Sequence, residues 1–258
     1  MTYCVGIVLD SGMVFASDSR TNAGVDYIST YSKMKVFEKA GDRAIVVMSS
    51  GNLSVTQNAI NMLEQHSRRD DPQGNIWAAE SLFEVARLLG TSLREVRERD
   101  AIYLQQNNID SSASFIIGGQ IKNERMRLFR IYTEGNFIEA TPETPFFQIG
   151  ETKYGRPIID RVVTPATSLM EAAKCVLVSF DSTMRSNISV GLPIDLASYE
   201  RDALQLKVKR RILESDAYFN MIHTRWGEGL RHVFSQLPDP DWGNEGATQA
   251  QYQGEIFK

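Results

Sequence analysis

The sequence predicts an α+β protein in which two antiparallel sheets are stacked between layers of helices. Short apolar runs separated by turn residues, which are typical of antiparallel strands, occur before residue 50 and again between residues 114 and 149. Two long helical patterns separate these groups of strands, and further helical patterns follow the second group. Groups of strands that alternate with groups of helices along a chain are typical of sheets covered by helices on one face.

The first half of the chain is expected to form two hairpins followed by two long helices. The turns Asp10-Ser11-Gly12 and Gly41-Asp42 each join two apolar runs, and glycine adopts the positive φ that tight turns require. Asn75 is a residue type that caps helices, and the apolar residues after it recur at helical spacing. The expected strands cover 3–9, 13–17, 33–38 and 44–48, and the expected helices cover 53–68 and 75–99.

The second half repeats the order of strands followed by helices. The expected strands cover 114–119, 126–133, 136–140, 146–149 and 189–196, and the expected helical regions cover 168–183 and 199–236. The last region is expected to present a solvated or subunit-facing basic face of a helix, formed by Lys207, Lys209, Arg210 and Arg211. We expect one domain over residues 1–237 and a polar tail over 238–258 that is disordered or docks on a neighbouring subunit.

The composition excludes several classes of function. The 258 residues include 28 basic and 32 acidic side chains, for a net charge of −4, so there is no basic surplus for binding nucleic acid. No apolar run reaches the roughly 20 residues that cross a membrane, and no secretory signal is visible, so we expect a cytoplasmic protein. The two cysteines and three histidines are scattered, so neither a metal site nor a cofactor is expected.

Thr2 stands directly before the first predicted strand and one peptide bond from the N-terminus. A threonine hydroxyl is a weak nucleophile, but the free α-amine of an N-terminal threonine, with a pKa of about 8, can take its proton. A nearby cation favours the neutral amine, and backbone N–H donors stabilise the oxyanion formed on a substrate. The sequence supplies a carboxylate at Asp18, cations at Lys33 and Lys35, and a small-residue turn at 48–51.

The order of these residues resembles the N-terminal third of a proteasome β subunit. The stretches that carry the resemblance are TYCVGIVLDSGMVFASDSRTNAG, KMKVFE and MSSG. A closer resemblance, through MTYCV, ASDSRTNAGVD and IST..KM.VFE, is to the bacterial proteasome-related peptidases called Anbu, and it extends along most of the chain. The resemblance implies a four-layer α-β-β-α sandwich of the N-terminal-nucleophile hydrolases. It also implies a peptide or peptide-like substrate and self-association into a ring or ring-like homo-oligomer.

The resemblance assigns roles to individual residues. Thr2 corresponds to the nucleophile, with its α-amine as the base, and Asp18 corresponds to the conserved carboxylate of the family pattern. Aligning the Lys-Val pair makes Lys35 the catalytic lysine, whereas Lys33 is a second candidate because strand alternation puts it on the same face. Ser50 corresponds to the glycine of the oxyanion hole, where only the backbone N–H is needed.

Further correspondences involve the middle of the chain and the substrate groove. Asp181 and Ser186 match a later Asp and Ser of the family across a short insertion, and Glu151 stands where the family has a serine near the threonine amine. The positions that bind the peptide backbone and first side chain are Thr21, Asn22, Met48, Gly51 and Asn52. Met48 and Asn52 are expected to form a medium-sized, neutral pocket.

Three functions remain open on this evidence. The first is a threonine peptidase that uses Thr2 after removal of Met1. The second is an oligomeric scaffold with little or no peptidase activity, which the replacement of serine by Glu151 and the altered region around Asp181 and Ser186 favour. The third is an amidase that uses the same chemistry on a small peptide-like metabolite. No feature of the sequence indicates a partner ATPase.

Overall fold

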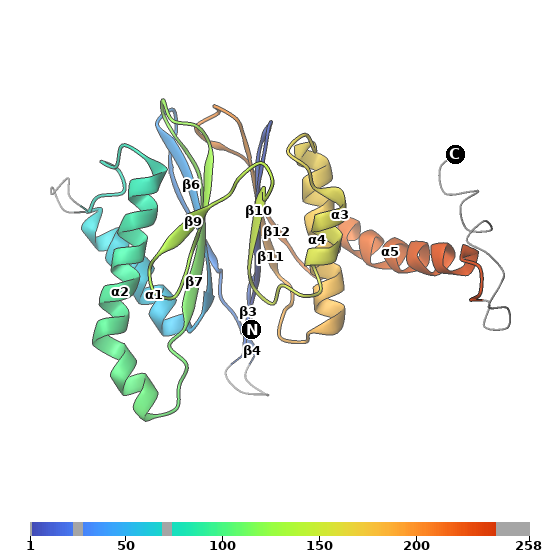
Figure 1. The fold of residues 1–258 in the computed structure, drawn as a ribbon, viewed down its shortest axis with the longest axis horizontal. Coiled ribbons are helices and arrows are strands. Elements are labelled where there is room, and N and C mark those ends of the chain that lie inside the picture. The colour runs from blue at the N-terminus through green and yellow to red at the C-terminus, as the bar shows by residue number, and fades with distance from the viewer. Residues whose placement is uncertain (1, 23–27, 69–73, 241–258) are drawn as a thin grey trace.

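A computed structural model describes residues 2–22, 28–68 and 74–240 of the chain, which are arranged in four layers (Figure 1). Two five-stranded sheets lie face to face, and helices cover the outer face of each sheet. All strand pairings within the two sheets are antiparallel. The expected α+β class and the α-β-β-α order of layers are therefore confirmed.

The first sheet contains the N-terminal strand at an interior position. Its order is β10-β1-β2-β11-β12, with bounds Phe146–Gly150, Tyr3–Leu9, Gly12–Asp18, Ile194–Glu200 and Leu206–Ile212. The second sheet has the order β5-β6-β7-β8-β9, with bounds Met34–Lys39, Arg43–Gly51, Ala113–Ile121, Arg127–Ile131 and Phe137–Glu139. A separate short hairpin consists of β3 (Arg20–Asn22) and β4 (Ile28–Thr30).

Two pairs of helices form the outer layers. The helices α1 (Leu53–His66) and α2 (Leu82–Gln106) cover the second sheet, and α3 (Arg156–Val162) and α4 (Leu169–Ser186) cover the first. The side chains of Asn52 and Ser81 accept hydrogen bonds from backbone N–H groups in the first turns of α1 and α2, respectively. Ser168 and Glu171 form a reciprocal capping box at the start of α4.

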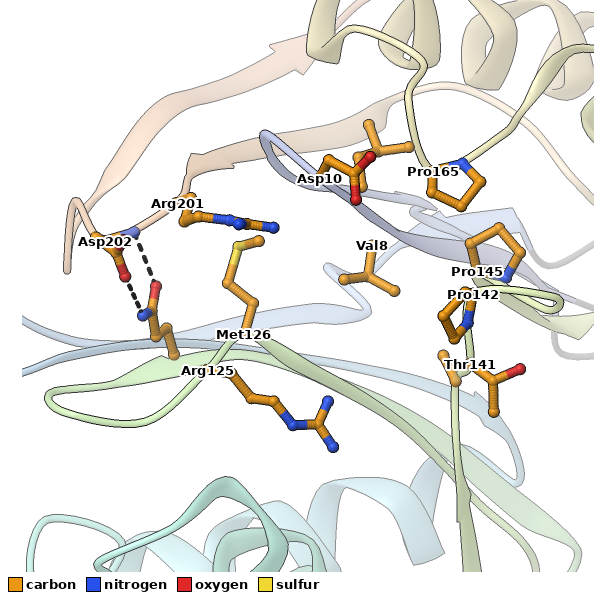
Figure 2. A pocket seen from close by; sticks show the side chains of 13 residues that line it. Val8, Asp10, Arg125, Met126, Thr141, Pro142, Pro145, Pro165, Arg201 and Asp202 are labelled. Atoms are coloured by element: carbon orange, nitrogen blue, oxygen red, sulfur yellow. Dashed lines mark hydrogen bonds between the residues drawn. The ribbon is translucent and has the colours of Figure 1, made fainter.

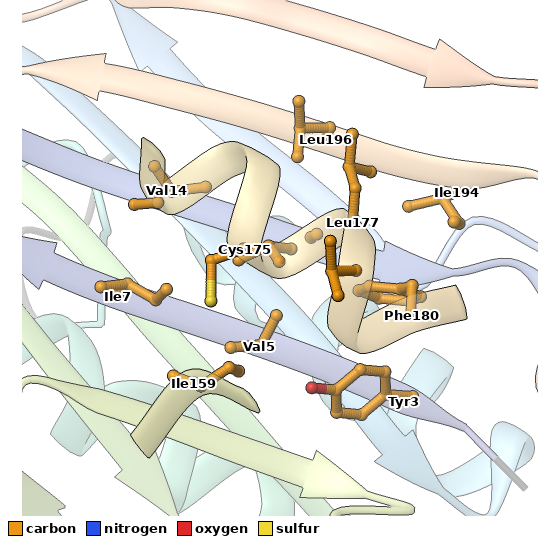
Figure 3. Packing of buried hydrophobic residues seen from close by; sticks show 14 of the residues in the cluster. Tyr3, Val5, Ile7, Val14, Ile159, Cys175, Leu177, Phe180, Ile194 and Leu196 are labelled. Carbon is orange, nitrogen blue, oxygen red and sulfur yellow. The ribbon is translucent and has the colours of Figure 1, made fainter. Parts of the chain in front are cut away.

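Strand β1 is apolar on both faces because it lies between two apolar layers. Tyr3, Val5 and Ile7 pack with α3 and α4 on its outer face, as Figure 3 shows. Cys4, on the opposite face, belongs to the core between the two sheets. Residue alternation along a strand therefore explains why a continuous apolar run, rather than an alternating pattern, begins this chain.

The region after residue 198 differs from the expected helix. Only α5 (Ala217–Gln236) is helical there, and the basic run at 207–211 lies in β12, which pairs with β11 alone. A strand at the edge of a sheet exposes its side chains to solvent, and lysines and arginines there discourage pairing with other chains. The charged residues hid the strand because they interrupt the apolar alternation by which strands are predicted.

Smaller differences have local causes. Asn75 accepts a hydrogen bond from the Trp77 N–H but caps only a short turn, and α2 begins after Ser81. The hairpin β3–β4 and the helix α3 were not expected, and β11 begins at Ile194 rather than at residue 189. Of the tail expected over 238–258, residues 241–258 lie outside the described part of the chain.

Helix α5 extends away from the four layers (Figure 1). Phe219 and Ile222 are buried near its start and join the core beneath α4. Within the described residues, no helix is long and apolar enough to span a bilayer. The same residues contain no cluster of His, Cys, Asp and Glu that could hold a metal ion.

Candidate active site

Thr2 is held in place at the beginning of β1 by contacts with the end of β10. The residue is 7% exposed, and its carbonyl accepts a 2.7 Å hydrogen bond from the backbone N–H of Glu151. Gly150 has a φ of +84°, and a Cβ atom at this position would lie 1.9 Å from the Thr2 carbonyl oxygen. Only glycine therefore lets β10 approach the N-terminal residue this closely.

Asp18 and Lys33 form a buried ion pair next to the N-terminal strand. The Lys33 Nζ lies 2.7 Å from Asp18 Oδ1, and the two side chains are 4% and 0% exposed. Asp18 Oδ1 also accepts a 3.0 Å hydrogen bond from the backbone N–H of Tyr3. The Lys33 ammonium donates a further hydrogen bond to the carbonyl of Arg20, at 2.7 Å. Asp18, which holds the Lys33 ammonium, therefore also contacts the backbone of Tyr3, the residue directly after Thr2.

The lysine beside Asp18 is therefore Lys33, and the assignment of this role to Lys35 is corrected. The Lys35 Nζ meets Glu64 on α1, and its side chain is 47% exposed. The alternation argument failed because β5 begins at Met34, so Lys33 precedes the strand and does not share its alternation with Lys35.

Burial dominates the electrostatics beneath Thr2. Loss of solvation raises the pKa of Asp18, whereas the Lys33 ammonium and the N–H donors of Tyr3 and Gly191 oppose this rise. Burial also raises the pKa of the Cys4 thiol, which donates to the carbonyl of Ser49 at 3.6 Å. Cys4 is therefore a neutral packing residue here rather than a thiolate nucleophile.

A cleft of about 580 Å³ opens over Thr2. It brings together five of the residues expected at the site, namely Thr2, Thr21, Ser50, Gly51 and Asn52. The remaining described residues that line it are Arg20, Ser29, Lys33, Ser49, Leu53, Ser54, Thr56 and Gly150. Seven of these 13 lining residues are serines or threonines, and Leu53 and Ser54 belong to the start of α1.

Met48 was expected in the substrate pocket, but its side chain is fully buried in the core between the sheets. Strand alternation along β6 gives the reason, because Met48 faces the opposite sheet. Asn22 ends β3, where its backbone pairs with Ile28. The cleft described above therefore contains Asn52 but not Met48, and the expected pocket of these two residues is not formed.

Glu151 has a partner near Thr2 that sequence reasoning missed. Its carboxylate accepts a 3.0 Å hydrogen bond from the Asn187 side chain, and both residues are buried. Asn187 directly follows α4, and its side chain reaches Glu151, the residue after the end of β10. Nothing in the sequence indicated this pair, because 36 residues separate Glu151 from Asn187.

Asp181 and Ser186 do not line the cleft among the described residues. Asp181 Oδ1 lies 2.5 Å from His223 Nδ1, an interaction that joins α4 to α5. Ser186 is exposed at the last residue of α4. The structure places Asn187 rather than Asp181 beside Glu151.

Arg20 is a second cleft residue that the sequence analysis did not single out. Its Nη1 donates to the carbonyl of Ile188 at 2.9 Å. Its guanidinium also occupies the space over Gly191, where an added Cβ would lie 2.3 Å from the Arg20 Cζ. The signal in the sequence was its spacing of two residues from Asp18.

Another cavity, of about 380 Å³, lies at the other end of β1 (Figure 2). Val8 and Asp10 line it from that end of the strand, opposite Arg125 and Arg201. Arg125 is paired with Glu139 at 2.7 Å. None of the residues expected to carry chemistry lies there, so the cleft over Thr2 is the candidate active site.

Comparison with solved structures identifies close relatives, whereas a scan of protein-family models and a search of curated proteins find no match. The chain is 50% identical to Anbu (ancestral β-subunit) from Yersinia bercovieri, with a TM-score of 0.86, over 92% of this chain and 99% of that one. It is 48% identical to the chain of a structure titled "Helical Assembly of the Anbu Complex from Pseudomonas aeruginosa", with a TM-score of 0.87 and coverage of 92% and 98%.

A third similar structure is the Anbu (Gly-1) mutant from Hyphomicrobium sp. strain MC1. The identity is 46% and the TM-score is 0.87, over 93% of this chain and 100% of that one. Identity at this level over nearly the whole length, together with the shared fold, shows common family membership. The chain belongs to the Anbu family of ancestral proteasome β subunits.

Proposed function

We propose that the protein is an amide hydrolase whose nucleophile is the hydroxyl of Thr2 after removal of Met1. The observation that carries this proposal is the convergence of Thr2 and Lys33 in one cleft, with Lys33 held by the buried Asp18. Peptides are the proposed substrates, as the resemblance to proteasome β subunits implies. The same chemistry would also serve an amidase that acts on a small peptide-like metabolite.

In the proposed reaction, Thr2 Oγ forms a bond to the substrate carbonyl carbon while its proton passes to the α-amine. The amide C–N bond then breaks, and the leaving amine takes the proton back from the α-ammonium. Water then attacks the resulting ester while its proton passes to the α-amine of Thr2. The ester C–O bond breaks, the α-ammonium returns the proton to the Thr2 oxygen, and the acid product leaves. Proton transfer by a positioned base contributes roughly 10²–10⁴-fold to such reactions.

Two groups support these steps electrostatically. The Lys33 ammonium disfavours a proton on the α-amine, which keeps the amine available as a base. The backbone at Ser50 and Gly51, which line the cleft with Thr2 and Gly150, supplies the proposed N–H donor to the oxyanion. Removal of a single oxyanion donor slows comparable enzymes by roughly 10²–10³-fold.

The test is the intact mass of the protein before and after exposure to a peptide epoxyketone. This reagent closes a ring only with a hydroxyl and a free α-amine on the same residue. We expect a starting mass that lacks Met1 and a single adduct that is absent in Thr2→Ala. A protein that lacks Met1 and forms no adduct with a panel of such peptides would contradict the proposal.

The second candidate function is a self-associating scaffold, and a feature of α5 favours it. Leu230, Val233, Phe234 and Leu237 are all more than half exposed and recur at helical spacing. Such a stripe is typical of a helix that packs against a partner. Because the Pseudomonas aeruginosa relative is described as a helical assembly, we propose that α5 contributes to self-association. Thr2→Ala separates the two functions, since a scaffold would keep its cellular role without the hydroxyl.

A further inference from the structure

Arg20 differs from the other cations near Thr2 because no carboxylate in the described part of the chain pairs with it. Lys33 is paired with Asp18, and Lys35 with Glu64. Within residues 2–22, 28–68 and 74–240, Arg20 forms no ion pair, and its side chain donates one hydrogen bond, to the carbonyl of Ile188. A guanidinium carries five N–H donors, so most of its donors have no partner among the described residues, and Arg20 is one of the residues that line the cleft.

The guanidinium is also held in position. Gly191 leaves the space that it occupies, because a Cβ atom there would meet the Cζ, Nε and Nη2 atoms of Arg20 at 2.3–2.7 Å. The main chain of Arg20 is fixed as well, since its carbonyl accepts the hydrogen bond from Lys33. An arginine fixed at both its backbone and its side chain loses little conformational entropy when it binds an anion.

The rest of the cleft suits an anionic ligand in the sign of its charge. Its described lining contains no Asp or Glu, and it contains hydroxyl groups from Thr21, Ser29, Ser49, Ser54 and Thr56. The first turn of α1 also lies at the cleft, and the N-terminal end of a helix favours negative charge. Most of these hydroxyls already have partners within the protein, since Thr21 bonds to Ser29, Ser54 to Asn52 and Thr56 to the Leu53 carbonyl. Charge, rather than unsatisfied hydroxyl groups, therefore favours an anionic ligand.

We propose that the cleft selects substrates that carry a carboxylate near the scissile amide, and that Arg20 is the residue that binds it. This inference rests on the proposed function, because it takes the cleft to be where Thr2 acts. The carboxylate has two available sources, an acidic side chain or the free C-terminus of a short peptide. Arginine binds either by charge-assisted hydrogen bonds, often in pairs.

The experiment compares matched substrates with the Met1-free protein. One pair of fluorogenic peptides has Glu or Gln at the residue that forms the ester, and a second pair ends in a carboxylate or a carboxamide. We expect kcat/KM to be roughly tenfold or more higher for the acid of at least one pair at low salt. The pair that shows the preference identifies the source of the carboxylate, and added salt should reduce it.

Arg20→Gln should bring the ratio of kcat/KM for the acid to kcat/KM for its amide close to one. Arg20→Lys should leave an intermediate ratio, because lysine keeps the charge without the paired donors. The matched control is Arg161→Gln, because Arg161 is an exposed arginine on α3 that likewise donates to one backbone carbonyl, that of Pro157. This control removes the same charge and should keep the preference. A ratio of one or less in the unmodified protein, or a ratio unchanged by Arg20→Gln, would overturn the inference.

A binding measurement separates this inference from the proposed function. Calorimetric titration of Thr2→Ala with each acid and its amide needs no catalysis. If no peptide is hydrolysed but the acid binds roughly tenfold more tightly, and Arg20→Gln in the same background removes the difference, the carboxylate site stands and the hydrolase proposal fails. Equal binding of acid and amide would reject the carboxylate site, whatever the outcome for hydrolysis.

Discussion

At the scale of single residues, Lys33 and Lys35 are a natural pair for comparison, because two positions separate a buried ammonium from an exposed one. Replacement of Lys33 by Met leaves Asp18 buried without its cation, and breaking a buried pair costs about 3–5 kcal/mol in stability. We expect Lys33→Met to lower the rate of Thr2 labelling by roughly 100-fold or more, because a larger fraction of the α-amine is then protonated and cannot accept the hydroxyl proton.

The control for this prediction is Lys35→Met, which removes only a partly exposed ion pair with Glu64. It should change stability by less than about 1 kcal/mol and leave the labelling rate nearly unchanged. Labelling by a peptide epoxyketone and unfolding in urea measure the two effects separately. Equal losses in the two variants would contradict the role proposed for Lys33.

Gly150 tests the close contact at Thr2. Gly150→Ala introduces a Cβ at 1.9 Å from the Thr2 carbonyl oxygen, in addition to the strain of a φ of +84°. Gly41→Ala is the matched control, because Gly41 has a φ of +76° and nothing within 4 Å of the added Cβ. We expect Gly41→Ala to cost about 1–2 kcal/mol in the free energy of unfolding, and Gly150→Ala to cost more and also to slow Thr2 labelling. If the two variants lose the same free energy of unfolding and label at the same rate, the close approach of Gly150 to Thr2 does not require glycine.

At the scale of elements, the pairing of β8 with β9 is reinforced by Arg127 and Glu139. The guanidinium Nε and Nη2 donate to the two carboxylate oxygens at 2.9 Å and 2.6 Å. These hydrogen bonds hold the pKa of Glu139 below its ordinary value. The unfolded state therefore binds the proton more readily, so the pair stabilises the fold above the ordinary glutamate pKa and loses this effect as the pH falls through the lowered pKa.

Glu139→Gln should therefore lower the free energy of unfolding by about 1 kcal/mol at neutral pH. The difference from the unmodified protein should shrink as the pH is lowered through the acid range. Glu134→Gln, at an exposed position between β8 and β9, is the control and should show little effect at any pH. Urea unfolding at a series of pH values measures both variants, and a difference that does not depend on pH would contradict the assignment.

The elements also show what sequence reasoning can recover. The first two hairpins were predictable because Asp10-Ser11-Gly12 and Gly41-Asp42 separate clear apolar runs, and the structure has strands on both sides of each turn. Strand β12 was not predictable in this way, because most of its side chains are exposed at the edge of a sheet and therefore show no apolar alternation. Local patterns report burial, and β12 has little of it.

The candidate site was predictable where it follows a strand end and not where it depends on distant packing. Asp18 ends β2, so its position followed from the hairpin alone. The pairing of Glu151 with Asn187 depends on how α4 returns to β10, and the choice of Lys33 depends on the residue at which β5 begins. These are tertiary facts that spacing along one sequence does not contain.

At the scale of the whole molecule, α5 extends away from the body of the fold (Figure 1). Exchange of Leu230 and Phe234 for Lys should reduce the mass measured by light scattering if α5 packs against another copy. Both side chains are more than half exposed, so the variant should fold normally. Met170→Lys, at an 80% exposed position on α4, is the control. A mass that the double variant leaves unchanged would show that other surfaces hold the assembly together.

The position of Thr2 directly before an interior strand has a further consequence for the proposed reaction. Whether the number of residues before Tyr3 is odd or even decides which face of the sheet the terminal side chain points to. Successive side chains of a strand point to opposite faces. One residue inserted between Thr2 and Tyr3 would turn the terminal hydroxyl to the wrong face of the sheet, while two would restore the face but move it by about 7 Å. Removal of one residue would instead leave Tyr3 as the terminus, with its ring among the apolar side chains beneath α4. The proposed nucleophile is thus placed by the number of residues that precede Tyr3.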